Sequence, residues 1–336
     1  MNLASLLLAP ADERPAQTAL RGSAAVSYRE LRDRVSRQAG MLADAVRAGD
    51  RVAIVAGNDD AFAVSYLAAL SVGAVAVPVN PAAPDAELSR QLASVEPALL
   101  LCGPGTGHHA LAGLDASAVW SPAAIEAGAE SAEPRAPVER DGDDVAVLLF
   151  TAGTSGAPRP AMLTHGNLEA NIAQVQSHPS TWRAGDDVVL GVLPFFHVYG
   201  LNVVLGVGLA SGSTIVPVAH FDPVVTARVV AEDRVTVLPA VPAMFRAWVD
   251  ASPGAIPADA FATVRLAVSG GAPLPLEVAV AFRDRFGVDV HDGYGLTETS
   301  PVVTTSAVDR APRPGSIGAP LPGVEVRLVD AQGADA

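Results

Sequence analysis

Short apolar runs alternate along the chain with stretches whose apolar positions recur at helical spacing. A continuous apolar run of four to eight residues, such as RVAIVA at 51–56, is typical of a strand buried on both faces of a parallel sheet. The pattern predicts strands over 51–56, 75–79, 98–102, 145–150, 188–193, 214–218, 235–239, 264–269 and 288–292, and helices over 60–72, 85–94, 167–176, 198–210, 223–232, 242–251 and 275–286. Strands separated by helices indicate parallel βαβ units. The pattern therefore predicts an α/β fold with two successive doubly wound, mostly parallel sheets.

The alternation is interrupted twice, which suggests how the chain is divided. Residues 103–143 are rich in Ala, Gly, Pro and Glu and predict a weakly structured bridge. After Ser300 the sequence changes to Pro, Gly and Val, and 324–329 predicts an antiparallel strand. We expect a first α/β subdomain with the bridge over 1–143, a second over 144–300, and an incomplete start of a small β-barrel over 301–336.

Charge and composition exclude some classes of function. The net charge is −14, which argues against nucleic acid as the main partner, so any phosphate ligand must be held by a local device. Cys102 is the only cysteine, so no intrachain disulfide can form, and this fits a cytoplasmic protein. Residues 188–221 carry no charged side chain, but proline, glycine and polar residues interrupt the run, and we expect no transmembrane segment.

Three loops follow predicted strands and carry residues suited to a nucleotide. The first, FTAGTSGAPR at 150–159, combines hydroxyls, glycines and one cation, and glycines allow backbone N–H groups to approach phosphate closely. It does not match the P-loop pattern GxxxxGK[ST]. The others are SGGAP at 269–273 and DGYGLTE at 292–298, where open α/β sheets place their ligands. Each alone is compatible with a structural turn; the set of three favours a ligand site.

Four ordered motifs resemble the AMP-forming adenylating superfamily of acyl-CoA synthetases, luciferases and peptide-synthetase adenylation domains. They are TAGTSGAPRPAMLTH at 151–165, SGGAPL at 269–274, YGLTE at 294–298 and GSIGAPLPG at 315–323. The resemblance begins near Ser27-Tyr28 and runs to the last residue. It implies that a carboxylic acid attacks the α-phosphate of ATP to give an acyl-adenylate and pyrophosphate. A thiol, usually that of CoA, then takes the acyl group, with Mg²⁺ as the metal.

The resemblance also implies a role for each matching position. Thr297 would contact the α-phosphate, Glu298 would bind Mg²⁺, and both would be catalytic together with Arg159. The β- and γ-phosphates would be held by Thr151, Gly153, Thr154, Ser155, Gly156 and Arg159. The adenine site would comprise Gly270, Gly271, Ala272, Pro273, Asp292 and Tyr294.

The substrate end is indicated by LPFFHVYGL at 193–201. Amino-acid-activating relatives usually carry an Asp after the Phe to pair with the ammonium group; His197 stands here and favours an acid without one. The apolar helix beyond it favours an alkyl chain, so we expect a fatty acid. The expected acyl contacts are His197, Val198, Tyr199, Asn202, Gly293 and Gly295. His197 as a satisfied buried histidine, an aryl or amino acid substrate, and a non-catalytic nucleotide-binding remnant remain alternatives.

The sequence departs from the family pattern in two places. Arg159-Pro160 replaces the usual Lys-Gly of the phosphate loop; a guanidinium is a planar fork rather than a point charge, and Pro160 lacks a backbone donor. The family's ribose-binding Asp, hinge and small C-terminal domain with its adenylation lysine do not follow. We therefore expect this sequence to be a piece of a longer enzyme, poorly active without that domain.

Overall fold

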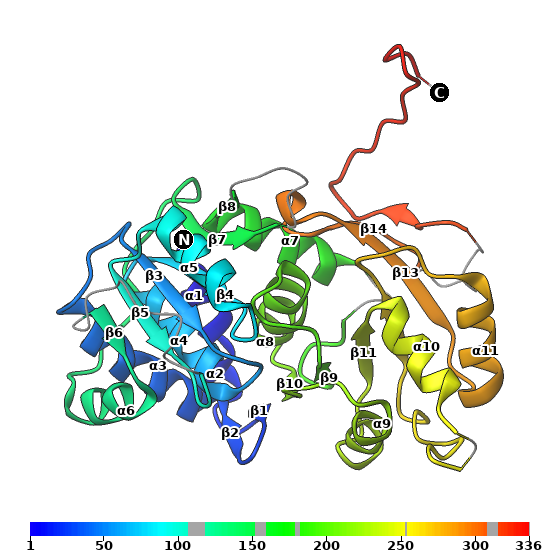
Figure 1. The fold of residues 1–336 in the computed structure, drawn as a ribbon, viewed down its shortest axis with the longest axis horizontal. Helices are drawn as coiled ribbons and strands as arrows, with labels where there is room; N and C mark the ends of the chain where they lie inside the picture. The colour runs from blue at the N-terminus through cyan, green and yellow to red at the C-terminus, as the bar shows by residue number, and fades with distance from the viewer. Residues whose placement is uncertain (107–117, 152–158, 179–181, 253, 308–314, 336) are drawn as a thin grey trace.

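Two sheets lie side by side, with helices packed between and around them (Figure 1). The computed structural model describes residues 1–106, 118–151, 159–178, 182–252, 254–307 and 315–335. The predicted α/β class with two mostly parallel sheets is confirmed.

The smaller sheet has six strands in the order β6-β5-β3-β4-β7-β8. β8 is antiparallel to β7, and the other pairings are parallel. Every residue of β4 is buried, as its continuous apolar run predicts. The strands are β3 (Arg51–Val55), β4 (Val75–Val79), β5 (Leu99–Cys102), β6 (Val119–Trp120), β7 (Val145–Phe150) and β8 (Pro160–Thr164), and the helices α3 (Tyr28–Ala43), α4 (Asp60–Ser71), α5 (Asp85–Val95) and α6 (Pro122–Ser131).

The larger sheet has nine strands in the order β15-β14-β13-β12-β11-β9-β10-β1-β2. Its parallel centre runs from β13 to β1, and β2, β14 and β15 are antiparallel. The strands are β1 (Thr18–Arg21), β2 (Ala25–Ser27), β9 (Val188–Gly191), β10 (Thr214–Pro217), β11 (Val237–Ala240), β12 (Leu266–Ser269), β13 (Val290–Gly295), β14 (Val302–Thr305) and β15 (Ala319–Pro320).

The helices that accompany this sheet include one π-helix, η3, and one short 3₁₀-helix, η4. They are α1 (Leu3–Leu8), α2 (Pro10–Glu13), α7 (His165–Ser177), η3 (Tyr199–Val207), α8 (Gly208–Ala210), α9 (Pro223–Glu232), α10 (Pro242–Asp250), α11 (Leu276–Phe286) and η4 (Thr297–Thr299). No helix in the described part of the chain is long and apolar enough to cross a membrane.

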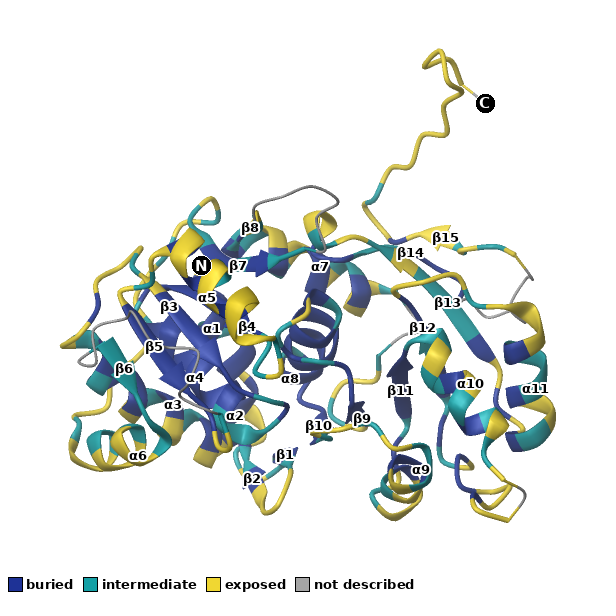
Figure 2. Ribbon diagram, in the orientation of Figure 1, coloured by how far each residue is buried: buried dark blue, intermediate teal, exposed yellow. Residues whose placement is uncertain are grey.

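One large apolar core joins the two sheets. It takes buried residues from α1, α3 and α4 and from α7 and η3, and Figure 2 shows buried segments gathered at the centre of the molecule. A second cluster lies under β11 to β13, where Phe245, Trp248, Phe261 and Phe282 pack mostly edge to face. The apolar surface of both sheets is thereby removed from water.

Several expectations about organisation differ from the structure. The bridge over 103–143 contains β6 and α6, and the hairpin β1–β2 and strand β8 were not predicted. The sheets do not divide at residue 143: β7 and β8 complete the first sheet, whereas β1 and β2 join the second. Residues 301–320 extend the second sheet through β14 and β15 rather than beginning a separate barrel.

The strand expected over 324–329 is absent from the described residues. Only an isolated bridge between Val329 and Asp335 forms there, and Val326 and Leu328 are exposed. The residues have strand-forming side chains, but no other described strand lies alongside to complete a ladder. A strand without a partner is not stable in water, which explains the difference.

Candidate active site

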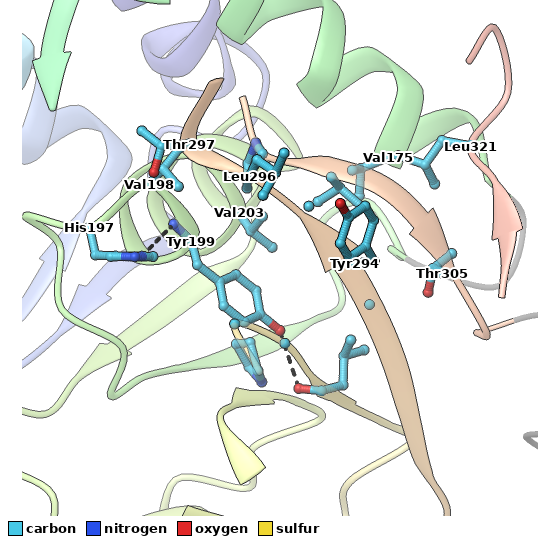
Figure 3. A pocket seen from close by; sticks show the side chains of 18 of the residues that line it. Val175, His197, Val198, Tyr199, Val203, Tyr294, Leu296, Thr297, Thr305 and Leu321 are labelled. Carbon is cyan, nitrogen blue, oxygen red and sulfur yellow. Dashed lines mark hydrogen bonds between the residues drawn. The ribbon is translucent and has the colours of Figure 1, made fainter. Parts of the chain in front are cut away.

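A cavity of about 280 Å³ lies between the larger sheet and the helices α7 and η3. Its floor comes from alternate residues of β11 and β12 and from β13, and η3 forms the opposite wall (Figure 3). It is lined by Thr151, Val175, Trp182, His197, Val198, Tyr199, Val203, Val237, Pro239, Leu266, Val268, Gly270, Gly271, Gly293, Tyr294, Gly295, Leu296, Thr297, Glu298, Pro301, Val302, Thr305 and Leu321.

The glycines after β12 bring backbone close to the cavity. A Cβ at Gly270 would lie 2.8 Å from Cε1 of Tyr199, and Gly271 has φ +80°, which disfavours other residues. Tyr294 on β13 is 42% exposed, so its ring offers a flat face at the cavity mouth. These three predicted adenine residues therefore lie together. Ala272 and Pro273 continue the same loop but are not among the described lining residues.

Tyr199 is the largest polar side chain on the helical wall. Figure 3 shows its ring lying across the cavity, with the hydroxyl donating to the carbonyl of Val268 at 3.2 Å. Burial raises the pKa of Tyr199 well above its usual range, and the nearby Asp292 raises it further. The phenol is therefore neutral and already has an acceptor, so it acts here as a shape-determining wall.

His197 stands at the beginning of the same wall and is exposed. Its Nδ1 accepts a hydrogen bond from the Tyr199 N–H at 3.3 Å, so the neutral ring carries its proton on Nε2. Desolvation by the surrounding protein lowers the pKa of His197. A neutral imidazole with a free Nε2–H is a hydrogen-bond donor at the mouth of the cavity.

Asp292 sits on β13 beside this wall but is not among the described lining residues. Both of its backbone groups pair with Ser306: its N–H donates to Ser306 Oγ at 2.7 Å, and its carbonyl accepts from the Ser306 N–H at 2.8 Å. Burial raises the pKa of its carboxyl to about 6. The carboxyl therefore changes its charge in the physiological pH range.

Thr297 and Glu298 lie on the one-turn helix η4, which follows β13. Both line the cavity, and Glu298 is exposed. The turn is closed by the Ser300 N–H, which donates to the Thr297 carbonyl at 3.2 Å. The hydroxyl and the carboxylate are thus presented side by side at the same opening as Gly270 and Tyr294.

The phosphate loop connects β7 to β8. Thr151, directly after β7, lines the cavity. Gly153, Thr154, Ser155 and Gly156 lie outside the described residues. Arg159 is exposed and is not among the described lining residues. Pro160 begins the edge strand β8, a position that tolerates a residue without a backbone N–H.

The arrangement matches a known family along nearly its whole length. The family model of the AMP-binding enzymes matches residues 8–336. The chain belongs to this family. It is 36% identical over 322 residues to a feruloyl-CoA synthase from Amycolatopsis, a match that covers 95% of this chain and 64% of that protein. The chain thus spans about two thirds of the length of this relative.

Two further comparisons concern the substrate and the nucleotide. A long-chain-fatty-acid–CoA ligase from Bacillus subtilis is 35% identical over 185 residues, which cover 55% of this chain and 33% of that protein. The crystal structure of ATP-bound MatB from Rhodopseudomonas palustris superposes with a TM-score of 0.89 at 30% identity, covering 100% of this chain and 67% of that one. The fold of an ATP-binding relative therefore extends over all of this chain.

The apolar end of the cavity was not predicted. Its residues come from α7, from the loop before β9, and from β11 and β12: Val175, Trp182, Val237, Pro239, Leu266 and Val268. They form no local motif, because each lies on a different element and only tertiary packing brings them together. Alternation along a buried strand shows which residues share a face, but not which face meets a ligand.

Of the expected acyl contacts, Asn202 lies apart from the others. His197, Val198, Tyr199, Gly293 and Gly295 line the cavity, whereas Asn202 is not among the described lining residues. It is 1% exposed, and its amide donates to the carbonyl of Ser300 at 2.7 Å. The amide of Asn202 is thus hydrogen-bonded to the protein backbone.

Proposed function

We propose that the protein activates a carboxylic acid with ATP to form an acyl-adenylate and then transfers the acyl group to CoA. One observation carries the proposal: the nucleotide motifs and an apolar wall open into a single cavity. Gly270, Tyr294 and Thr297 stand at one end of that cavity, and Val237 and Leu266 at the other. An acid bound against the apolar wall would present its carboxylate to the α-phosphate, and holding the two reactants in this way accelerates the reaction.

The residues at the opening fit the nucleotide roles. Gly270 and Gly271 would lie along adenine and Tyr294 would stack on it, while the Thr297 hydroxyl would donate to an α-phosphate oxygen. Such donors stabilise the charge that develops as pyrophosphate leaves. Thr151, Gly153, Thr154, Ser155, Gly156 and Arg159 would hold the β- and γ-phosphates.

Glu298 is the residue that we assign to Mg²⁺. No three acidic, histidine or cysteine side chains gather as a metal cage in the described part of the chain. Mg²⁺ does not need one when it travels with ATP, because one or two carboxylates, the substrate phosphates and water complete its octahedron. The metal would neutralise phosphate charge, and Glu298 offers the hard oxygen that places it.

We propose an acid with a compact apolar body of the aryl-propenoate type. The cavity of about 280 Å³, which also includes the nucleotide end, lies just below the usual size of small-ligand pockets, roughly 300–1,000 Å³, and favours a compact acid over a long alkyl chain. The part of the cavity floor that runs from Leu266 to Gly270 is only about 13 Å long, which limits the length of an acid that lies along it. The similarity to a feruloyl-CoA synthase supports this class. Among the described lining residues Glu298 is the only acid, so an ammonium group of an amino acid would lack a second carboxylate.

A fatty acid is the second candidate. The helical wall carries Val198 and Val203, which suit an alkyl chain, and the Bacillus subtilis relative acts on a long-chain fatty acid by its name. The two candidates differ in the depth of cavity that they need.

Pyrophosphate release over a panel of acids, measured on the complete product of the gene, tests the proposal. With ATP, Mg²⁺ and CoA, we expect ferulic and 4-coumaric acids to be turned over with the highest kcat/KM, hexanoic acid less well, and palmitic acid least. Acid-dependent AMP formation separates a ligase from a plain ATPase. A preference for palmitic acid would favour the second candidate, and no acid-dependent pyrophosphate from any member of the panel would overturn the function.

A further inference from the structure

A buried asparagine connects the helical wall of the cavity to the turn that carries Thr297 and Glu298. Asn202 lies on η3, and its Nδ2 donates to the carbonyl of Ser300 at 2.7 Å and to that of Leu168 at 3.3 Å. It is three residues after Tyr199 and directly before Val203, which both line the cavity. The same helix therefore contacts the acid-binding space on one side and the turn on the other.

A second asparagine holds the next residues of the same segment. Asn171 on α7 is 3% exposed, and its Nδ2 donates to the carbonyl of Val302 at 2.8 Å. Its Oδ1 accepts from the N–H of the same Val302 at 3.2 Å. The amide thus pairs with both backbone groups of one residue, as a neighbouring strand would, and fixes the place where β14 begins.

Within the described residues, the segment from Leu296 to Val302 makes its other hydrogen bonds with its near neighbours along the chain, although η4 also packs against β8. Its remaining hydrogen bonds are local: the Leu296 N–H donates to the Pro301 carbonyl at 3.2 Å, and the Thr299 N–H donates to the Leu296 carbonyl at 3.1 Å. Within the described residues, the side chains that reach it by hydrogen bonds from other helices are Asn171 and Asn202. Thr297 and Glu298 lie between these anchored residues and β13.

The Asn202 amide lies directly beside a glycine of the same helix. Gly206 lies one turn further along η3, and a Cβ there would stand 2.7 Å from Oδ1 of Asn202 and 3.1 Å from Cδ1 of Ile172. A methyl group at 206 would therefore displace the amide. π-Helical geometry is rare and is often found at functional sites, and here it carries both Asn202 and Gly206.

We propose that Asn202 and Asn171 are positioning residues, which fix Thr297 and Glu298 relative to the acid-binding wall. The inference rests on the proposed function for the roles of Thr297 and Glu298. Neither asparagine touches the substrate; each acts through the backbone of Ser300 or Val302. Because Asn202 joins the turn to η3 by a hydrogen bond, a movement of η3 on binding of the acid would also move the turn that carries Glu298.

Two substitutions on η3 test the proposal. Asn202→Leu keeps the volume of the side chain and removes the donor, and Gly206→Ala leaves the amide in place but displaces it. Gln38→Ala is the matched control, because Gln38 is also a buried amide with one side-chain partner, Ser65 Oγ at 3.0 Å, on helix α3. Each is compared with the unmodified protein by hydrogen-exchange mass spectrometry and by calorimetric titration with ATP·Mg²⁺.

We expect amide exchange over 296–302 to become about tenfold faster in Asn202→Leu and Gly206→Ala, because a lost hydrogen bond lowers the local opening free energy. ATP·Mg²⁺ affinity should fall by a similar factor in both, with no change in Gln38→Ala. In a Thr297→Ala background, Asn202→Leu should add less than twofold to the loss of affinity, because the two changes act on one turn.

Amide exchange over 296–302 tests the positioning role without any nucleotide. If the unmodified protein binds no nucleotide, that result counts against the proposed function and not against the positioning role. Unchanged exchange in both η3 variants overturns the proposal. So does faster exchange without any loss of ATP·Mg²⁺ affinity in a protein that binds ATP, since Asn202 would then be merely structural.

Discussion

Glu298 is an exposed acid for which the described residues provide no stabilising contact of its carboxylate. It stands on η4 at the cavity opening, and no hydrogen bond or ion pair to its carboxylate is found among the described residues. Glu298→Gln keeps the shape and removes the charge. ATP affinity in the presence of Mg²⁺ should fall about tenfold to a hundredfold, the range of one charge-assisted interaction, while the melting temperature stays the same.

The control for this prediction is Glu277→Gln. Glu277 is an exposed acid on α11, away from the cavity, and its ion pair with Arg246 is exposed as well. Calorimetry with ATP and Mg²⁺ should show no change for this variant. A loss of stability with unchanged nucleotide affinity in Glu298→Gln would contradict the metal role.

Asp292 gives a prediction about pH. Burial raises the pKa of its carboxyl from 3.8 to about 6. Between these values the native state holds a proton that the unfolded state has lost, so the free energy of unfolding falls as pH rises from about 4 to about 6, and this loss stays constant above. Asp292→Asn has no carboxyl to ionise, so its free energy of unfolding does not fall in this way. Between pH 4 and pH 6 its stability relative to the parent should therefore rise, on the order of 1 kcal/mol after allowance for solvent screening.

Urea unfolding at several pH values measures this difference. Asp289→Asn is the control, because the Asp289 side chain directly before the same strand β13 is exposed, so the substitution removes a carboxylate without removing a buried one. A constant difference between Asp292→Asn and the parent at all pH values would show that the carboxyl is not desolvated.

At the scale of single residues, the sequence indicated the chemistry but not the direction of the side chains. Gly270, Tyr294, Thr297 and Glu298 were identified from motifs, and the structure brings them to one opening. Asn202 was assigned to the substrate by its position in a motif, yet its amide faces Ser300. On a helix of irregular period, sequence spacing does not determine which neighbour a side chain meets.

The π-helix η3 depends on a close approach of backbone to backbone. Gly200 has no room for a side chain, because a Cβ would lie 2.2 Å from the carbonyl oxygen of Pro194. Gly200→Ala should therefore destabilise the protein by about 1–3 kcal/mol, as overpacking does, and move His197 away from the cavity mouth. Urea unfolding and the KM for the acid are the measurements.

Gly208→Ala in the adjacent helix α8 is the matched control. A Cβ at 208 would meet Cδ1 and Cγ1 of Ile215 at 3.1 and 3.2 Å, atoms of a side chain that can yield. The better helix propensity of alanine, about 0.8–1 kcal/mol, offsets part of that cost. Equal destabilisation by the two substitutions would mean that the contact with Pro194 is not what shapes η3.

At the scale of elements, the predicted helices and strands agree with the structure wherever apolar runs are long and bounded. β4 and β7 occupy the predicted residues, and α9 does too. The elements that were missed are short or polar: β1 has four residues, and α6 has no buried residue to give it a periodic pattern. The π geometry of η3 was also missed, because the apolar pattern over 198–210 predicts a helix but does not distinguish its α from its π form.

At the scale of the molecule, the sequence predicted two sheets but not how the chain is shared between them. The N-terminal hairpin β1–β2 pairs with β10 of the larger sheet, nearly two hundred residues later. Parallel pairing of this kind leaves no local signal, because the partner strand is set by the tertiary core that joins both sheets. The sequence predicts the order of the strands along the chain but not their order within the sheets.

Asn58 is the residue through which this joining of the two sheets can be tested. It follows β3 of the smaller sheet, and its Nδ2 donates to the carbonyls of Gly191, the last residue of β9 in the larger sheet, at 2.9 Å and of Leu193 at 2.7 Å. Its Oδ1 accepts from the Phe195 N–H at 2.9 Å. One buried amide thus pairs with three backbone groups; the Gly191 carbonyl also accepts from the Val218 N–H at 3.0 Å, whereas Asn58 is the partner found for the other two among the described residues.

Asn58→Ala leaves the Leu193 carbonyl and the Phe195 N–H unpaired in the interior, where each costs about 1–3 kcal/mol, and the free energy of unfolding should fall by about 2 kcal/mol or more. Because Phe195 precedes His197 in the loop at the cavity mouth, the KM for the acid should rise as well.

Asn80→Ala is the control, since the Asn80 amide oxygen accepts from the nearby Ala82 N–H at 2.9 Å in an exposed turn. Trp120 lies on β6 of the smaller sheet, so the measurements use a Trp120→Phe background, in which Trp248 under the larger sheet and Trp182 remain. In this background, urea unfolding followed by tryptophan fluorescence and by far-ultraviolet circular dichroism, which reports both sheets, should give coincident transitions for the parent. If Asn58→Ala separates the two transitions, the amide is needed for the sheets to unfold together; if it changes neither the midpoint nor the KM, the hydrogen bonds to β9 are not what connects them.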